Sequence, residues 1–225
     1  MIELKDVCFA YGQRAVLRHI NLTIHQGETI VLQGPNGCGK STLIRILNGL
    51  SYANQGDYIF EGQKIDEKSM RNDIFSKSFH QRIGYVFQNP DVQLFCSSVE
   101  EEIAFAPMQM ELEKGEVEKR VEDCLNLLGI QELRNQPPYY LSTGEKKKVA
   151  IASILAMNPK VFVLDEPLSG LDIETQEWLT QFLLQLKRSG KTMIIATHNP
   201  SFANKLADRI VCINKEHTIE SIQKI

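Results

Sequence analysis

Residues 34–41 of the chain read GPNGCGKS, a complete G-x-x-x-x-G-K-S sequence. The apolar run 29–32 precedes it, and the helix-like segment 41–47 follows. In this setting the glycines let backbone N–H groups turn inward around a phosphate, and the helix N-terminus adds partial positive charge. A glycine-rich turn that only caps a helix is the alternative, but both flanking segments favour a loop that binds a nucleoside triphosphate. Lys40 would then reach the β- and γ-phosphates, and the Ser41 hydroxyl would ligate Mg²⁺.

Three apolar segments are each followed directly by polar residues. Residues 29–32 precede the loop, 161–164 precede Asp165 and Glu166, and 192–197 precede His198. Buried strands that end in polar chemistry indicate a parallel sheet with ligands at its carboxyl edge. Further strands are predicted at 2–7, 20–24, 56–62 and 82–88.

Beyond residue 88 the pattern changes from strand to helix. Ser98 to Glu101 fits a capping box that opens a helix over 100–105, and apolar residues at helical spacing predict a second helix over 116–128. A second capping box, Ser142 to Glu145, precedes a helix over 146–157.

These patterns predict an α/β fold: a P-loop NTPase core with a parallel sheet, an N-terminal antiparallel β subdomain and an inserted helical subdomain. The length of 225 residues suits one domain of this kind. We assign 1–88 and 149–225 to the nucleotide-binding core with its β subdomain, and 89–148 to the helical subdomain.

The pair Asp165-Glu166 after an apolar strand is a Walker B arrangement. Asp165 would hold Mg²⁺ directly or through water, and Glu166 would poise the attacking water. A surface acidic turn is the alternative, but the presence of Lys40 in the same chain favours the functional interpretation. His198 could contact the γ-phosphate or the attacking water, although a lone histidine at a strand end is more often packed or solvated.

Charge and cysteine content limit the other possibilities. The net charge of −3 provides no basic field for nucleic acid, so we expect no nucleic-acid partner. The apolar stretches fall short of the ~20 residues that cross a bilayer, so any membrane role would come through a partner. The first six residues carry charge where a signal peptide would be apolar. Five scattered cysteines without a C-x-x-C pair argue against disulfides and zinc, and fit a reducing cytosol.

Cys38 lies inside the phosphate loop and has two interpretations. It is either a small space-filling residue, or a thiol whose pKa the helix N-terminus lowers. In the second case a thiol reagent would block nucleotide binding.

The order of these pieces resembles the ATP-binding cassette (ABC) ATPases over nearly the whole chain. The matching pieces are Tyr11, 34–41, Gln88, LSTGE at 141–145, 161–166, SGLD at 169–172, and His198. The segment 141–145 is the most specific of them. The stretch 88–107 further resembles the ATPase subunits of energy-coupling-factor importers, which serve uptake of vitamins and of cobalt or nickel ions.

The resemblance implies a role for each matching residue. Tyr11 would stack on the adenine, and Gln88 would sense Mg²⁺ and water. Glu166, His198 and Gln88 would be catalytic, and Ser41, Gln88 and Asp165 would hold Mg²⁺. The implied ATP-binding residues are Tyr11, Gly34, Asn36, Gly37, Cys38, Gly39, Lys40, Ser41 and Thr42.

The resemblance also implies that one chain carries only half of each ATP site. Leu141, Ser142, Thr143, Gly144 and Glu145 would contact the ATP of a second ABC ATPase subunit, identical or different, with Asp172 at the interface. A two-fold dimer would enclose two nucleotides, close on ATP and open when the γ-phosphate is lost. Integral membrane transport subunits would dock on the helical insertion, placing the chain at the cytoplasmic face of the cell membrane.

Two residues depart from the usual L-S-G-G-Q signature. Thr143 restricts backbone angles that glycine leaves free, and Glu145 adds negative charge near a triphosphate. The lysines 146–148 either offset that charge or form a solvated helix face. These departures motivate one alternative, a nucleotide-gated, weakly hydrolysing subunit paired with a more active ATPase. A soluble ABC ATPase acting on ribosomes or DNA is the other, against which the single cassette and the near-neutral charge argue. The transported solute cannot be read from the sequence.

Overall fold

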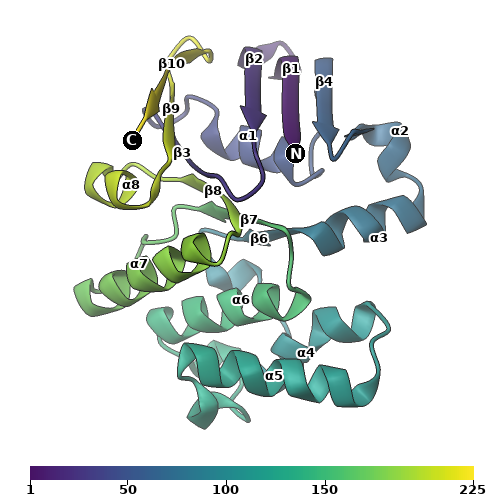
Figure 1. Cartoon of the computed structure of the whole chain (residues 1–225), viewed down its shortest axis with the longest axis vertical. Helices are drawn as coiled ribbons and strands as arrows, with labels where there is room; N and C mark the ends of the chain where they lie inside the picture. The colour runs from purple at the N-terminus through teal and green to yellow at the C-terminus, as the bar shows by residue number, and fades with distance from the viewer.

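The computed structural model describes residues 1–225, and it places two β-sheets above a group of helices along the long axis of the molecule (Figure 1). The sheets are linked through α1 (Lys40–Leu47), which packs between them. No helix in the structure is both long enough and apolar enough to cross a bilayer.

The N-terminal sheet is antiparallel, with strand order β2-β1-β4-β5. Its strands are β1 (Ile2–Tyr11), β2 (Arg14–Ile24), β4 (Gln55–Phe60) and β5 (Gln63–Lys64). Along β1, Ile2, Leu4 and Val7 are buried in the hydrophobic core that contains α1, and a register shift between Leu4 and Val7 interrupts the two-residue alternation. The predicted antiparallel β subdomain is confirmed, and its first two strands are longer than the alternating patterns alone indicated.

The second sheet has six strands in the order β10-β9-β3-β8-β7-β6. Five are parallel: β3 (Thr29–Gln33), β6 (Ile83–Val86), β7 (Val161–Asp165), β8 (Thr192–Ala196) and β9 (Arg209–Ile213). Along β8, Met193 and Ile195 enter one hydrophobic core while Ile194 and Ala196 enter the other. Because both faces are covered, these strands read as continuous apolar runs. The predicted parallel sheet is confirmed.

Several helices and one strand of the structure were not predicted from the sequence. The edge strand β10 (Ile219–Lys224) pairs antiparallel with β9 and is largely exposed. Two helices, α2 (Glu67–Met70) and α3 (Asp73–Arg82), precede β6, and each begins at an Asp or Asn cap. Two more, α7 (Ile173–Arg188) and α8 (Pro200–Leu206), cover the sheet on the side of the helical group.

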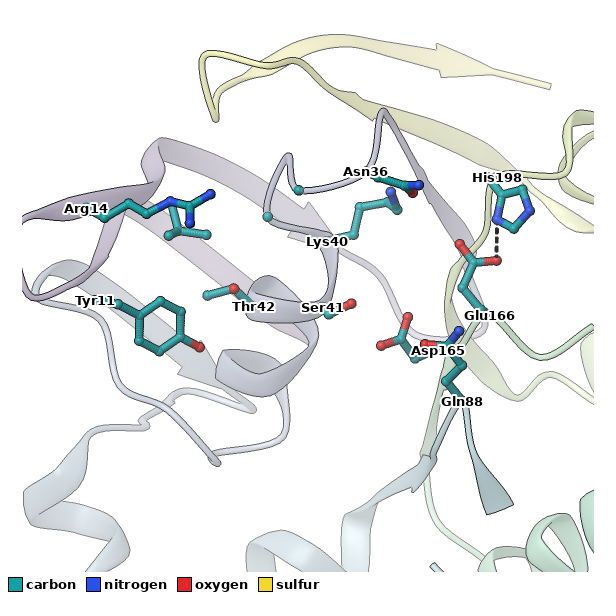
Figure 2. A pocket seen from close by; sticks show the side chains of 13 residues that line it. Tyr11, Arg14, Asn36, Lys40, Ser41, Thr42, Gln88, Asp165, Glu166 and His198 are labelled. Carbon is teal, nitrogen blue, oxygen red and sulfur yellow. Dashed lines mark ion pairs between the residues drawn. The ribbon is translucent and has the colours of Figure 1, made fainter. Parts of the chain in front are cut away.

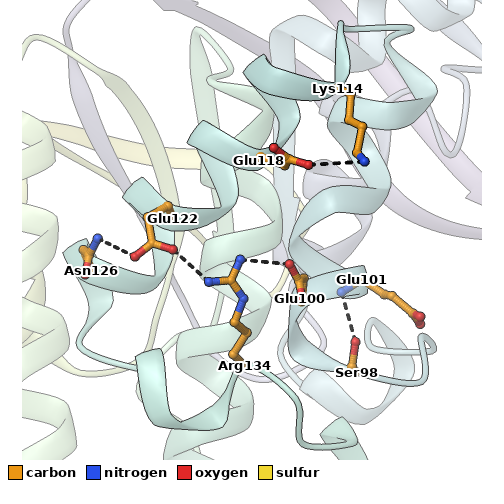
Figure 3. A network of polar contacts seen from close by, with 8 residues as sticks. All are labelled: Ser98, Glu100, Glu101, Lys114, Glu118, Glu122, Asn126 and Arg134. Atoms are coloured by element: carbon orange, nitrogen blue, oxygen red, sulfur yellow. Dashed lines mark hydrogen bonds and ion pairs between the residues drawn. The ribbon is translucent and has the colours of Figure 1, made fainter.

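The helical group occupies the expected part of the chain. It consists of α4 (Val99–Gln109), α5 (Lys114–Leu128) and α6 (Thr143–Met157), with short 3₁₀ turns at Pro90–Val92, Gln131–Leu133 and Pro138–Tyr140. Arg134 joins two of these helices, because its guanidinium lies 2.9 Å from Glu100 of α4 and 2.8 Å from Glu122 of α5 (Figure 3). The proposed division at 148/149 falls inside α6, so this helix is shared between the two parts.

The two predicted capping boxes differ in the structure. Ser142 and Glu145 form the complete box at α6. At α4 only half of it forms: the Ser98 hydroxyl accepts from the Glu101 N–H, but the Glu101 carboxylate accepts from the N–H of Ser97 instead of that of Ser98. The competing hydrogen-bond donor at Ser97 is the physical reason for this correction, and α4 begins at Val99.

Candidate nucleotide-binding site

A cavity of about 520 Å³ opens at the carboxyl edge of the parallel sheet (Figure 2). Tyr11 and Arg14 lie at one end, Glu166 and His198 at the other, and the phosphate loop between them. The lining contains predicted residues from five separate segments: Tyr11, Asn36, Gly37, Gly39, Lys40, Ser41, Thr42, Gln88, Asp165, Glu166 and His198. Two predicted residues, Gly34 and Cys38, do not line it.

Backbone geometry explains why the loop needs glycine. Gly34 has φ +149°, and a Cβ there would lie 2.2 Å from the carbonyl oxygen of Ile213. Gly39 has φ +114° and caps α1, where a Cβ would lie 2.5 Å from the carbonyl oxygen of Val16. Any other residue at either position would both clash and strain the backbone.

The Lys40 ammonium lies across the loop. Its Nζ donates hydrogen bonds to the carbonyl oxygens of Gly34 at 2.8 Å and Pro35 at 3.3 Å. The side chain is almost fully buried, so the charge is held at the floor of the cavity. This position suits an interaction with phosphate oxygens, because a point charge there adds to the loop N–H groups.

Cys38 is a packed residue. Its side chain is 1% exposed within the core under α1, and its carbonyl oxygen lies 3.1 Å from Nδ1 of His217. Burial of the sulfur supports the space-filling interpretation over that of a reactive thiol.

We therefore expect iodoacetamide to modify Cys38 of the native chain much more slowly than the partly exposed Cys8, with ATP affinity unchanged. Mass spectrometry of peptides from timed samples measures both rates, and chain unfolded in urea serves as the control in which both react. Rapid native modification of Cys38 with loss of ATP binding would contradict this.

The two acidic residues at the end of β7 have different surroundings. Asp165 is 6% exposed, and burial raises the pKa of its carboxyl, an effect that the neighbouring Ser41 hydroxyl opposes. Glu166 Oε2 lies 2.9 Å from Nδ1 of His198, which is itself solvent-exposed (Figure 2). The structure thus brings the proposed water-activating carboxylate and the histidine into direct contact.

Glu166 also has an unusual backbone. Its φ is +43°, in the left-handed region that non-glycine residues rarely adopt. Two hydrogen bonds hold it there, from its own N–H to the Ala196 carbonyl at 2.9 Å and from the Ser169 N–H to its carbonyl at 3.0 Å. Such strain is typical of functional sites whose surroundings fix the conformation.

The predicted metal ligands suit Mg²⁺. The Ser41 hydroxyl, the Gln88 side-chain oxygen and the Asp165 carboxylate all line the same cavity. Hard oxygen donors with one buried carboxylate are the chemistry that Mg²⁺ prefers beside phosphates.

The signature residues lie elsewhere. A separate, smaller cavity of about 350 Å³ is lined by Ser142, Thr143, Gly144, Glu145, Lys148, Gly170, Asp172 and Thr175, and it shares no residue with the first. Leu141, the first residue of the signature segment, is buried in the hydrophobic core. Asp172 caps α7 by accepting from the Thr175 N–H at 2.8 Å, which holds the pKa of its carboxyl below the usual value.

Both signature departures are accommodated. Thr143 takes the first helical position of α6. The Glu145 carboxylate accepts from the Ser142 N–H at 2.8 Å and from its hydroxyl at 2.7 Å, and these bonds lower the pKa of Glu145. Its charge is therefore directed to the N-terminus of its own helix, where a negative charge is stabilising.

The three lysines after the signature are not a solvated face, and that interpretation was wrong for Lys147 above all. Lys146 pairs with Asp91 at 2.7 Å, and the Lys148 ammonium lies 4.7 Å from the centre of the Trp178 ring. Lys147 is fully buried. The inward direction of its side chain on α6 could not be read from three consecutive lysines.

Two further lining residues, Arg14 and Val16, escaped the sequence analysis. Tyr11 pairs directly with Arg14 across the β1–β2 hairpin, and Gly12 at the turn has φ +58°. A hairpin prediction from the turn at Gly12 would have placed Arg14 beside Tyr11.

Known proteins resemble this chain over most of its length. The ABC transporter family profile matches residues 17–169. The nickel import ATP-binding protein LarO of Lactiplantibacillus plantarum is 44% identical, covering 98% of this chain and 92% of LarO. The energy-coupling factor transporter ATP-binding protein EcfA of Methanothermobacter thermautotrophicus is 42% identical, covering 97% of this chain and 70% of EcfA.

Solved structures show the same fold. The structure of cbiO1 from Clostridium perfringens, described as part of the ABC transporter complex cbiONQ, superposes with a TM-score of 0.88 at 34% identity, covering 99% of this chain and 88% of cbiO1. A dimeric ATP-binding cassette in a post-hydrolysis state with ADP and Pi superposes with a TM-score of 0.87 at 29% identity, covering 100% of this chain and 98% of that cassette.

Proposed function

The chain belongs to the ABC transporter family of ATPases, and on that premise we propose that it is the ATP-hydrolysing subunit of an energy-coupling-factor-type importer. Its family membership, predicted from the motifs, is confirmed by the family match and by relatives above 40% identity. The importer assignment is supported by relatives whose names describe nickel import and energy coupling, and by a structural neighbour from a transporter complex.

One observation carries the proposal: a single chain holds the P-loop, Glu166 and His198 in one cavity and the signature residues in another. A complete ATP site therefore needs a second chain, identical or related, that presents its signature cavity to the first. Such an arrangement converts binding and loss of a phosphate into closing and opening of a dimer.

Within one half-site, each residue has a defined task. Tyr11 stacks on the adenine, and loop N–H groups with Lys40 hold the phosphates. Glu166 accepts a proton from the attacking water as its oxygen bonds to the γ-phosphorus and the bond to the β–γ bridging oxygen breaks. His198, in contact with Glu166, fixes the direction of that carboxylate. Ser41, Gln88 and Asp165 would hold Mg²⁺, which would supply positive charge beside the phosphates.

The second half-site is built for a phosphate presented from outside. Ser142 and the N–H of Gly144 stand at the N-terminus of α6, a helix of 15 residues whose dipole favours negative charge there. When the γ-phosphate leaves, the contacts that join the two chains are lost and the dimer opens.

The surface for the membrane subunits is proposed on the helical group. Val92, Phe95, Phe105 and Met108 expose apolar side chains there, and the rings of Phe95 and Phe105 meet edge-to-face at 4.9 Å. An adjoining groove between α3 and α4, of about 310 Å³, is lined by Phe105, Met110 and Met157 together with Lys77 and His80. Docking here would hold the chain at the cytoplasmic face of the membrane and let dimer closure move the partner.

The two alternatives receive less support. A weakly hydrolysing subunit was motivated by Thr143 and Glu145, but the structure accommodates both, and Glu166 and His198 are in contact. An ABC ATPase of ribosomes or DNA is disfavoured by relatives that are named as transporter subunits.

Co-expression with candidate membrane subunits tests the importer assignment. We expect the tagged chain to copurify with integral membrane subunits, and vesicles containing the complex to accumulate nickel, cobalt or a vitamin when ATP is supplied. The same complex carrying Lys40→Met, which cannot hold the phosphates, is the matched control. An active ATPase that copurifies with no membrane protein would refute the importer function while leaving the family intact.

Replacing Tyr11 by alanine should raise the KM for ATP by roughly 5- to 150-fold, because base–aromatic stacking is worth ~1–3 kcal/mol. Tyr11→Phe keeps the ring and should stay near the wild-type value. Steady-state phosphate release against ATP concentration measures both. An unchanged KM in Tyr11→Ala would remove Tyr11 from the adenine site.

A further inference from the structure

Lys147 is a charged residue with no exposed surface. Burying an ammonium is costly unless polar partners replace its water, and Lys147 has two such partners. Its Nζ donates to the carbonyl oxygen of Phe87 at 3.1 Å and to that of Gln88 at 2.8 Å. Burial lowers the pKa of Lys147 to about 8, while the charge of Asp165 acts against that shift.

The Gln93 side chain forms a second link between Phe87 and α6. Gln93 accepts from the Phe87 N–H at 3.1 Å and donates to the Ala150 carbonyl of α6 at 2.8 Å. Both backbone polar groups of Phe87 are thus linked to α6, the N–H through Gln93 and the carbonyl oxygen through Lys147. The short segment between β6 and the Pro90–Val92 turn, which carries Gln88 into the ATP cavity, is fixed on this one helix.

The same helix carries the signature residues. Ser142 caps α6, and Lys147 follows in its second turn, within a continuous hydrogen-bonded helix. Lys147 points inward to Gln88 while the cap of α6 faces the second cavity. One rigid turn of helix therefore connects the residues proposed to touch the partner's ATP with the backbone that positions Gln88 beside the chain's own ATP.

We propose that Lys147 is a positioning residue that fixes the Phe87–Gln88 backbone to the first turns of α6, so that Gln88 enters its working position when the signature end of α6 engages the partner's ATP. The proposal rests on the function argued above, and it concerns a residue that touches neither ATP nor the reacting atoms. A loss of this link would leave ATP binding to a single chain intact and would affect the step that follows dimer closure.

The test compares the effects on KM and on kcat for ATP in variants of the 225-residue chain. Lys147→Met keeps the length and removes the donors, and it should lower kcat roughly 10- to 100-fold with KM for ATP within about twofold of wild type, since small misplacements in an active site cost this much. Lys147→Gln restores a neutral donor and should recover part of the lost rate. Lys119→Met, which makes the same change at an exposed lysine of α5, is the matched control and should stay near wild type.

A second variant covers the case in which Lys147→Met does not fold. Gln93→Met removes the other link at Phe87 and should also lower kcat without raising KM, with ATP-driven dimerisation retained. A folded Lys147→Met chain with wild-type kcat, or a folded Gln93→Met chain with wild-type kcat where Lys147→Met cannot be purified, overturns the proposal. An inactive wild-type chain in the same assay would instead count against the proposed function.

Discussion

Replacing Glu166 by glutamine should lower the rate of ATP hydrolysis by a factor of ~10²–10⁴ and leave ATP binding intact. The amide has nearly the shape of the carboxylate but cannot accept the proton of the attacking water. Glu166 directly follows the buried strand β7, and only 15% of its side chain is exposed, so a replacement of the same shape is not expected to disturb the sheet. Because the γ-phosphate would persist, the variant should also accumulate as an ATP-bound dimer.

Two measurements check this prediction. Phosphate release under saturating ATP gives kcat, and light scattering with ATP and Mg²⁺ gives the dimer population. Glu118→Gln makes the same chemical change at an exposed carboxylate of α5 and should behave as wild type. Equal hydrolysis rates for Glu166→Gln and wild type would exclude Glu166 as the water-activating base.

The parts of the fold that the sequence predicted well are those in which local chemistry and fold impose the same pattern. The strand before residues 34–41 must be buried and parallel so that the loop reaches the edge of the sheet, and its central residues, Ile30 to Leu32, are accordingly apolar without alternation. The Ser142–Glu145 box was predictable because both partners lie within one helical turn. At Ser98 the same pattern was misleading, since a neighbouring serine competes for the glutamate.

The residues that could not be predicted depend on contacts between distant segments. Lys147 is buried because the backbone after β6 offers two carbonyl oxygens, and those lie about sixty residues away in the chain. The left-handed backbone of Glu166 is fixed by Ala196 of the adjacent strand, which no local pattern reports. Predicted roles for the cavity residues remain predictions, whereas their convergence from five segments is a property of the fold.

A mixture of two inactive chains should regain ATPase activity if each site is shared between subunits. Ser142→Asp retains an N-cap residue for α6 but places a negative charge where the partner's γ-phosphate is proposed to lie, so it should be inactive alone. Glu166→Gln should also be inactive alone. In a mixed dimer, one site combines the intact Glu166 of the first chain with the intact Ser142 of the second. Random pairing makes about half of the dimers mixed, and one of the two sites in each mixed dimer is intact. About one quarter of all sites in the mixture should therefore be functional.

The mixture decides between shared and self-contained sites because the two models give opposite results. If Ser142 acted on the ATP of its own chain, every site in the mixture would contain one defect and activity would stay at the sum of the separate chains. Ser142→Asn, a neutral N-cap residue, is the control that separates the effect of charge from the loss of the hydroxyl. It should retain more activity than Ser142→Asp if repulsion of the phosphate is the cause. Recovery on mixing would also follow the concentration of the two chains, since only associated subunits can build a site from the separate cavities of Glu166 and Ser142.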